Sequence, residues 1–276
     1  MKRFKAHLLF IGILATSFCM AQKPKSDAES GELKGKVKSL KTTTMTTQAR
    51  ADGTLKMMTE ITTDYFNENG NIILSMIRHG NQKLDDTLYT VKYYGNNRKE
   101  VVSYSKVGYR CEKDIWFFDS KDFVYKIIHC FSNPIEWRED VINLFDNRGF
   151  IIKKILKYSY RNDSIVAYYK YDDYGNKIEE TDEEIKMKSH YKYDKKGNCI
   201  EKFVEVLGDG DNWFKYVWDY DDYNNPIKFK AYTNNRKECE ITTSEYKYDS
   251  QKNYIKILER SNTRPTIEIV RVIEYY

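Results

Sequence analysis

Aspartates that follow an aromatic residue recur along this chain and are its most regular chemically reactive feature. Tyr171–Asn176 reads Tyr-Asp-Asp-Tyr-Gly-Asn, and Tyr193–Asn198 reads Tyr-Asp-Lys-Lys-Gly-Asn. A carboxylate can act as a general acid or bind a cation. Here, however, the Asp can accept hydrogen bonds from the backbone of a turn, and the Gly supplies the positive φ that such a turn needs. We therefore expect these aspartates to cap turns and not to catalyse.

The other reactive residues do not cluster in the sequence. His79, His129 and His190 occur one at a time, and no Ser, Cys or Asp forms a recognisable nucleophile motif with any of them. No glycine-rich phosphate loop is present. The sequence therefore predicts no catalytic residues and no cofactor, and indicates that the protein is not an enzyme.

One acidic segment resembles a calcium loop. Residues 208–213 read Gly-Asp-Gly-Asp-Asn-Trp, but Trp213 stands where an EF-hand loop needs an oxygen ligand, and the distal Glu is missing. Asp-Gly pairs are also strong hairpin formers. We expect a turn at this segment and no metal site.

Four cysteines lie outside the N-terminal segment: Cys111, Cys130, Cys199 and Cys239. They form no CxxC pair, so a zinc site has little support. If Ser120 and Lys121 form a two-residue loop, Cys111 faces Cys130 across a hairpin and the two could form a disulfide in an oxidising compartment. A bulged turn would shift the register by one residue and separate them. Both arrangements stay open from the sequence.

The aromatic residue before each turn marks a tandem repeat. These anchors lie 22 to 28 residues apart, and Tyr276 lies 28 residues after the last of them, so the final strand is expected to close the array as a half-unit. A small unit repeated in this way needs its neighbours to bury its apolar face, which favours one continuous repeat domain. The anchors are Phe66, Tyr94, Phe118, Phe145, Tyr171, Tyr193, Tyr220 and Tyr248.

A second series of turn signals lies roughly midway between the anchors, including Asp52-Gly53 and Asn133-Pro134. Residues 185–193 alternate Ile, Met and Tyr on one side with Lys and His on the other, which is typical of a half-buried strand. The pattern predicts about eighteen short strands between Val37 and Tyr276. We expect an all-β antiparallel meander of hairpin repeats that forms an open, spiral or barrel-like sheet.

The motif Tyr-Asp-x-x-Gly-Asn at Tyr171–Asn176 and Tyr193–Asn198 resembles the YD repeat of the Rhs and teneurin families. The resemblance spans the chain from about residue 54 to its end, although only two copies match fully. Gly35–Leu40 also resembles the start of small secreted Bacteroidetes proteins of this type. The resemblance implies a spiralling β-hairpin shell and a carbohydrate or protein partner. The chain is short for these families and has no recognisable core-cleavage motif or toxin segment.

The N-terminus predicts export. Lys2, Arg3 and Lys5 precede a short apolar run that ends at Phe18, which is typical of a signal peptide over residues 1–21. Residues 22–35 form an expected solvated lead-in, and residues 36–276 form the repeat domain. Cys19 is an alternative lipidation site, although the bulky Phe18 before it disfavours that cleavage. We expect a periplasmic, outer-membrane-associated or extracellular protein.

Loss of the three leader cations takes the formal net charge from +5 to +2, so the mature chain is nearly balanced and no nucleic-acid partner is expected. Most tyrosines should fill one face of the sheet. The rings before an anchor should point to the other face, where they could stack on sugars or contact a protein. The candidate binding residues are Tyr65, Tyr93, Phe117 and Trp213.

The favoured function is therefore a secreted or envelope repeat protein, monomeric and non-enzymatic, that binds a glycan or an envelope protein. We expect no membrane span in the mature chain. The main alternative is an outer-membrane β-barrel, because a meander of about eighteen strands after a signal peptide suits one. Against it, residues 176–182 contain too few apolar residues for a lipid-facing band. A hydrolase whose site is not visible in the sequence is the third alternative.

Overall fold

Eighteen antiparallel strands form the whole of the described fold. The computed structural model describes residue 28 and residues 33–49, 54–80, 86–95, 97–104, 111–120, 123–130, 136–160, 162–208, 212–234 and 239–276. In chain order the strands are β1 Val37–Ala49, β2 Leu55–Phe66, β3 Ile72–His79, β4 Asp86–Tyr94, β5 Arg98–Tyr104, β6 Cys111–Phe118, β7 Val124–Cys130, β8 Glu136–Phe145, β9 Ile151–Tyr158, β10 Ser164–Tyr171, β11 Lys177–Asp182, β12 Met187–Tyr193, β13 Cys199–Val206, β14 Trp213–Tyr220, β15 Pro226–Thr233, β16 Glu240–Tyr248, β17 Tyr254–Ser261 and β18 Ile267–Tyr275.

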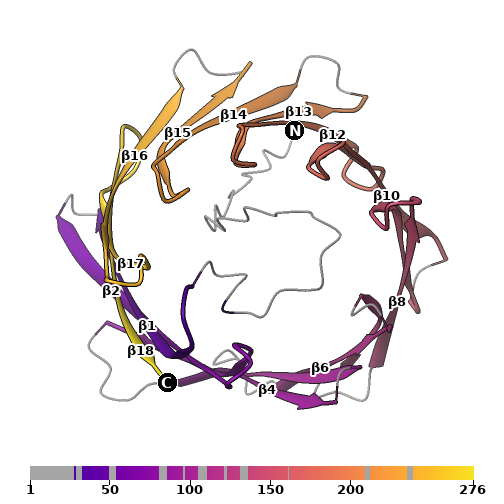
Figure 1. Ribbon diagram of the computed structural model, residues 1–276, viewed down its shortest axis with the longest axis horizontal. Coiled ribbons are helices and arrows are strands. Elements are labelled where there is room, and N and C mark those ends of the chain that lie inside the picture. The colour runs from indigo at the N-terminus through magenta and orange to yellow at the C-terminus, as the bar shows by residue number, and fades with distance from the viewer. Residues whose placement is uncertain are drawn as a thin grey trace.

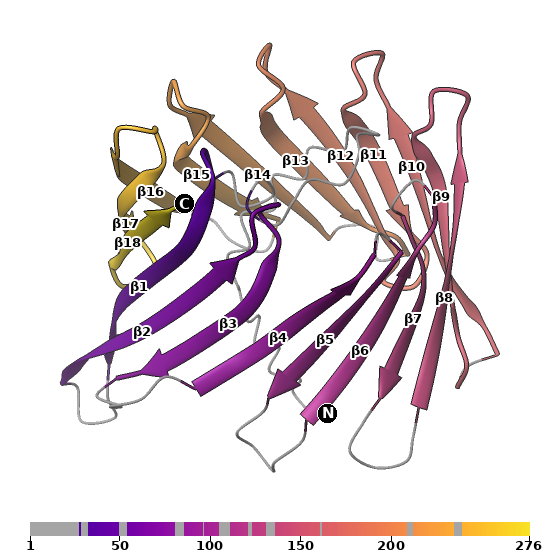
Figure 2. The same ribbon diagram turned by 60° about the horizontal axis from the view of Figure 1, so that its bottom comes forward.

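The sheet closes on itself as a barrel. Each strand pairs with the next along the chain, and β1 pairs with both β2 and β18, from Leu40 opposite Ile273 to Thr46 opposite Ile267. Figure 1 shows the resulting ring, and Figure 2 shows the tilted strands from the side. The predicted meander is thus confirmed, and of the open, spiral and barrel-like forms the barrel is the one adopted.

The anchor turns form as the Tyr-Asp motif predicts. Asp194 Oδ1 accepts the backbone N–H groups of Lys196 and Asn198, both at 2.8 Å, and the Asn198 side chain donates to Asp194 Oδ2 at 2.9 Å. Burial alone would raise the pKa of Asp194, but these bonds hold it below its usual value. The equivalent Asp residues at other turns accept backbone N–H groups in the same way, so they act as turn caps.

Glycine at the fourth position after the anchor is explained by the backbone. Gly175 and Gly197 have φ of +87° and +85°, in the left-handed region that only glycine adopts without strain. Asn224 and Lys252 occupy the same position in later repeats, with φ of +67° and +65°. The frame of the turn is therefore kept even where the glycine has been lost.

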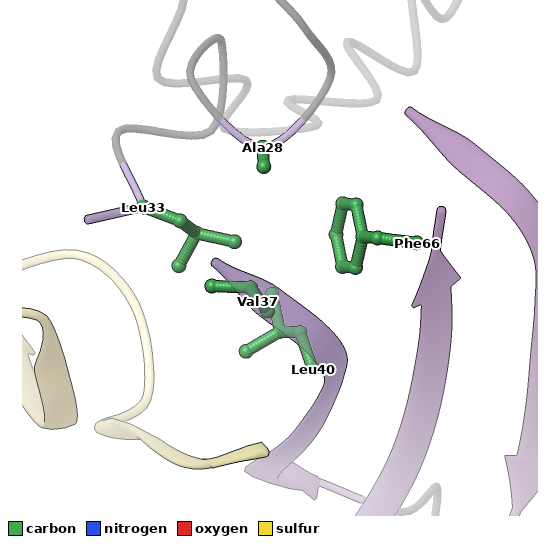
Figure 3. Close-up of a cluster of buried hydrophobic side chains, with 5 residues drawn as sticks. All are labelled: Ala28, Leu33, Val37, Leu40 and Phe66. Atoms are coloured by element: carbon green, nitrogen blue, oxygen red, sulfur yellow. The ribbon is translucent and has the colours of Figure 1, made fainter. Parts of the chain in front are cut away.

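A small apolar cluster lies beside the junction of the first and last strands. Ala28 and Leu33 pack with Val37, Leu40 and Phe66, all of them buried (Figure 3). Nearby, the Asn253 side chain in the β16–β17 turn binds both the N–H and the carbonyl of residue 34, at 2.7 and 2.8 Å. The lead-in was expected to be solvated, but its Ala28 and Leu33 are buried.

The predicted signal peptide and Cys19 lie outside the described residues, as do Asp209–Asp211 of the calcium-like segment. Among the residues that are described, no helix has the length and apolar character needed to cross a membrane.

Candidate functional site

The cluster around Phe66 identifies the inner face of the barrel. The described segment that leads into β1, residues 33–36, lies inside the ring (Figure 1), and Phe66 points toward Leu33 and Ala28, which pack with it (Figure 3). Residues directly opposite one another on neighbouring strands share a face, so the strand register extends this assignment to every strand. Tracing the register from Phe66 through β3 to β9, or through β1 and β18 to β11, places Ala167 of β10 on the inner face in both cases. Two walls of different chemistry result.

The inner wall is rich in aromatic rings. An eighteen-stranded barrel is wide enough to leave a water-filled lumen, so rings on its inner face that are not fully packed can meet a ligand. The inner-wall aromatic residues of β10 to β18 are Tyr169, Tyr171, Tyr191, Tyr193, Phe214, Tyr216, Trp218, Tyr220, Phe229, Tyr246, Tyr248, Tyr254 and Tyr275.

Hydroxyl groups hold many of these rings in place. Tyr171 donates to the carbonyl of Ile151 at 2.9 Å, Tyr193 to that of Lys177 at 2.7 Å, and Tyr220 to that of Cys199 at 2.8 Å. In each case the acceptor lies six residues after the preceding anchor. The bonds therefore fasten each repeat to the one before it and fix the ring orientation.

The outer wall is charged. Every strand other than β2 places at least one charged residue on it, and pairs of strands are joined by ion pairs. Glu201 lies 2.8 Å from both Lys192 and Lys215, and Glu179 lies 2.9 Å from Lys170 and 3.3 Å from Lys188. The hydrogen bond from Lys192, followed by that from Lys215, lowers the pKa of Glu201. Such a wall is suited to water.

The four predicted binding residues do not share one face. Tyr65, Phe117 and Trp213 lie on the outer wall, opposite Ser39, Arg98 and Glu205 respectively. Tyr93 lies on the inner wall, opposite Lys99, and donates to the carbonyl of Ile72 at 3.2 Å. The set that was expected to form one surface is therefore divided, and binding by any of the four stays a prediction.

The placement of Tyr93 follows from a shorter turn. Tyr94 pairs with Arg98, four residues on, whereas the other anchors pair six residues on across a bulge. Without the bulge Tyr93 takes the inner position, and its hydroxyl makes the bond that the anchors make elsewhere. The second anchor is thus Tyr93 and not Tyr94. The ninth is Tyr275, whose hydroxyl donates to Asp249 Oδ2 at 2.6 Å.

Strand register also bears on the expected disulfide. A bulge between Phe117 and Phe118 shifts the pairing of β6 with β7, and Lys113 lies opposite Cys130. Cys111 is therefore two positions away along β6, and its side chain lies outside the described set. The Cys111–Cys130 bond stays a prediction.

An acidic pair around a histidine was not apparent from the sequence. His129 Nδ1 lies 2.8 Å from Asp114 Oδ1, and His129 Nε2 lies 3.8 Å from Glu139 Oε2, all on the inner wall. Three strands bring them together, so no spacing in the chain could have revealed them. Within the described part of the chain, no group of three His, Cys, Asp or Glu residues has metal-binding geometry.

Comparisons with known proteins find similarity of structure but not of sequence. No protein-family model matches the chain, and no curated protein matches it. A porin-like protein from Bacteroides uniformis is 8% identical, with a TM-score of 0.46 over 86% of this chain and 96% of that one. A porin-like protein from Bacteroides vulgatus is 13% identical, with a TM-score of 0.33 over 87% and 99%.

A Photorhabdus luminescens Tc holotoxin pore is 10% identical, with a TM-score of 0.32, over 83% of this chain but only 16% of that chain. These scores are too low to support a functional argument. The resemblance to YD repeats therefore rests on the motif residues alone.

Proposed function

We propose that this chain is an exported barrel protein of the cell envelope that binds saccharide chains on its inner wall without catalysing a reaction. The observation that carries the proposal is the contrast between the walls: most aromatic rings of β10 to β18 lie on the inner wall, and most of the ion pairs lie on the outer wall. Aromatic rings offer flat apolar faces with polar edges, which suits a ligand that has both apolar faces and hydroxyl groups.

The geometry of β14 and β15 supports this function. Tyr216, Trp218 and Phe229 lie together on the inner wall, with ring centroids 5.6 to 6.1 Å apart. Each of them is only partly buried. These three rings face the lumen and provide a surface on which a sugar ring could stack. From the sequence, such a surface was expected on the face opposite the anchors, whereas these rings share the inner wall with the anchors.

Two tryptophans of β14 provide a matched test. Trp218→Ala should weaken binding to the best ligand of a glycan array by about tenfold or more, because it removes an inner ring. Trp213→Ala, on the outer wall of the same strand, should change affinity less than about twofold. Affinity is measured by calorimetry, with melting curves confirming that both variants fold. Loss of binding only with Trp213→Ala would move the site to the outer wall.

An outer-membrane barrel is the second candidate, and the closed sheet agrees with it better than with an open interaction surface. Closure leaves no unpaired strand edge, as a membrane-spanning sheet requires. The outer face of β2 also carries no charge, and its Leu55 and Met57 are 73% and 68% exposed. On the other strands a lysine at mid-membrane would cost about 2–4 kcal/mol.

Fractionation separates the two candidates. The full chain, expressed with its own leader, should leave the membrane fraction in an alkaline carbonate wash and should stay at the bottom of a flotation gradient, because its outer wall is solvated. Retention in the floated membranes after the wash would favour the outer-membrane barrel instead.

A further inference from the structure

Two lysines flank one tyrosine ring on the inner wall of β11 to β13. Lys177 Nζ lies 4.9 Å from the centre of the Tyr191 ring, and Lys202 Nζ lies 5.4 Å from it. The Tyr191 hydroxyl donates to Glu180 Oε2 at 2.7 Å. The hydroxyl bond fixes the ring, and the ring in turn positions both ammonium groups.

The charges of this group do not balance. Glu180 Oε2 pairs with Lys177 at 2.7 Å, so one carboxylate neutralises one lysine. Among the described residues, no carboxylate lies within ion-pair distance of Lys202, which interacts with Glu180 only at longer range. Burial lowers the pKa of Lys202, more than the charge of Glu180 raises it. One partly desolvated cation is therefore left to bind an anion.

Lys202, the lysine without a carboxylate partner among the described residues, lies beside the three inner-wall rings of β14 and β15. Lys202 is directly opposite Tyr191 on one side and Tyr216 on the other, and Tyr216 packs with Trp218 and Phe229. The Tyr216 and Phe229 rings are nearly parallel, at 14°. A ligand whose ring lay on these faces would therefore place a substituent near Lys202.

We propose that this sector, the Lys202 site, binds a carboxylate-bearing saccharide, with the carboxylate on Lys202 and the sugar ring on Tyr216, Trp218 and Phe229. This inference rests on the proposed function and adds the charge of the ligand. A single free ammonium group matches a single carboxylate. Glu180 would repel a doubly charged phosphate, so a uronic-acid type of sugar fits the site better than a phosphorylated one.

The test uses an oligogalacturonate and its fully methyl-esterified form, which keeps the ring and removes the charge. In calorimetry the native chain should bind the acid about tenfold or more tightly than the ester, in line with a charge-assisted hydrogen bond. Lys202→Met should abolish that preference while leaving binding of the ester unchanged. Lys230→Met, on the outer wall two strands away, should preserve the preference. Lys202→Gln serves as a second variant if Lys202→Met does not fold.

The outcomes separate this inference from the proposed function. Equal binding of acid and ester, or a preference that survives both Lys202 variants, overturns the Lys202 site, while binding that still depends on Trp218 leaves the proposed function in place. Binding of neither form to the native chain also overturns the acidic-saccharide inference. The glycan array with Trp218→Ala then decides separately whether the inner wall binds saccharides.

Discussion

Gly175→Val is expected to lower the free energy of unfolding by about 4 kcal/mol, the largest single effect that the turn geometry predicts. Two costs add at this position. The backbone has φ of +87°, where a β-branched residue is strained by about 1–3 kcal/mol. A Cβ would also lie 2.7 Å from Cζ of Phe150, a ring atom of the preceding turn.

The Phe150 ring has little freedom to move aside. It stacks on Tyr171 at 4.9 Å and 22°, and Arg148 lies 4.9 Å above it. Tyr171 is in turn held by its hydroxyl bond to Ile151. Overlap of a new side chain with this ring should therefore cost about a further 1–3 kcal/mol, as overpacking does in other cores.

Gly149→Val is the matched control. Gly149 occupies the same position one repeat earlier, with φ of +88°, and a Cβ there would meet no atom within 4 Å. The stability lost in Gly149→Val should therefore reflect backbone strain alone. Urea unfolding of both variants measures the difference in their free energies of unfolding. If the two variants lose equal stability, the Phe150 contact contributes nothing and the packing argument for Gly175 is wrong.

Local chemistry explains why the turns could be predicted. Asp194, Gly197 and Asn198 interact within one five-residue turn, so the motif contains every group that the structure uses there. The number of strands follows for the same reason, because each strand lies between two turn signals. The resemblance to YD repeats describes this local unit well.

Register was harder to predict because it depends on bulges. The copy at Tyr94 reads Tyr-Gly-Asn-Asn-Arg and has lost the aspartate of the motif. Its shorter turn has no bulge, and this exchanges the faces of Tyr93 and Tyr94. The bulge at Phe117 likewise sets Lys113 and not Cys111 opposite Cys130. A one-residue change in a turn inverts every side chain of the strand that follows. The aromatic residue before each turn does not reveal whether the turn has a bulge, so the register could not be predicted from these residues.

The inner wall itself could not be predicted from alternation alone. The alternation of Met187, Ser189 and Tyr191 with Lys188, His190 and Lys192 separates two faces, but it does not say which face becomes concave. Closure of β1 on β18 decides that, and these strands are more than 200 residues apart. The Lys202 site draws on residues of five strands, β11 to β15, and on closure, so it has no signature along the chain.

Asp221→Ala is expected to lower the free energy of unfolding by about 2–4 kcal/mol, because Asp221 serves two repeats at once. Its Oδ1 accepts the backbone N–H groups of Tyr223 and Asn225, at 2.8 and 2.9 Å. Its Oδ2 accepts the hydroxyl of Tyr248, the next anchor. Burial, followed by the bond to Asp221, raises the pKa of Tyr248, in keeping with a protonated hydroxyl that donates to the carboxylate.

The neighbouring residue supplies the control. Asp222 is fully exposed, and its one ion pair among the described residues is with Lys196 at 3.8 Å, so Asp222→Ala should leave the urea midpoint unchanged. Tyr248→Phe completes a double-mutant cycle with Asp221→Ala, and the coupling between them should be about 1–2 kcal/mol. Additive losses would mean that the Asp221–Tyr248 bond does not help to join these two repeats. Coupling would mean that the aspartate predicted as a local turn cap also fastens successive repeats together, through the hydroxyl of the next anchor.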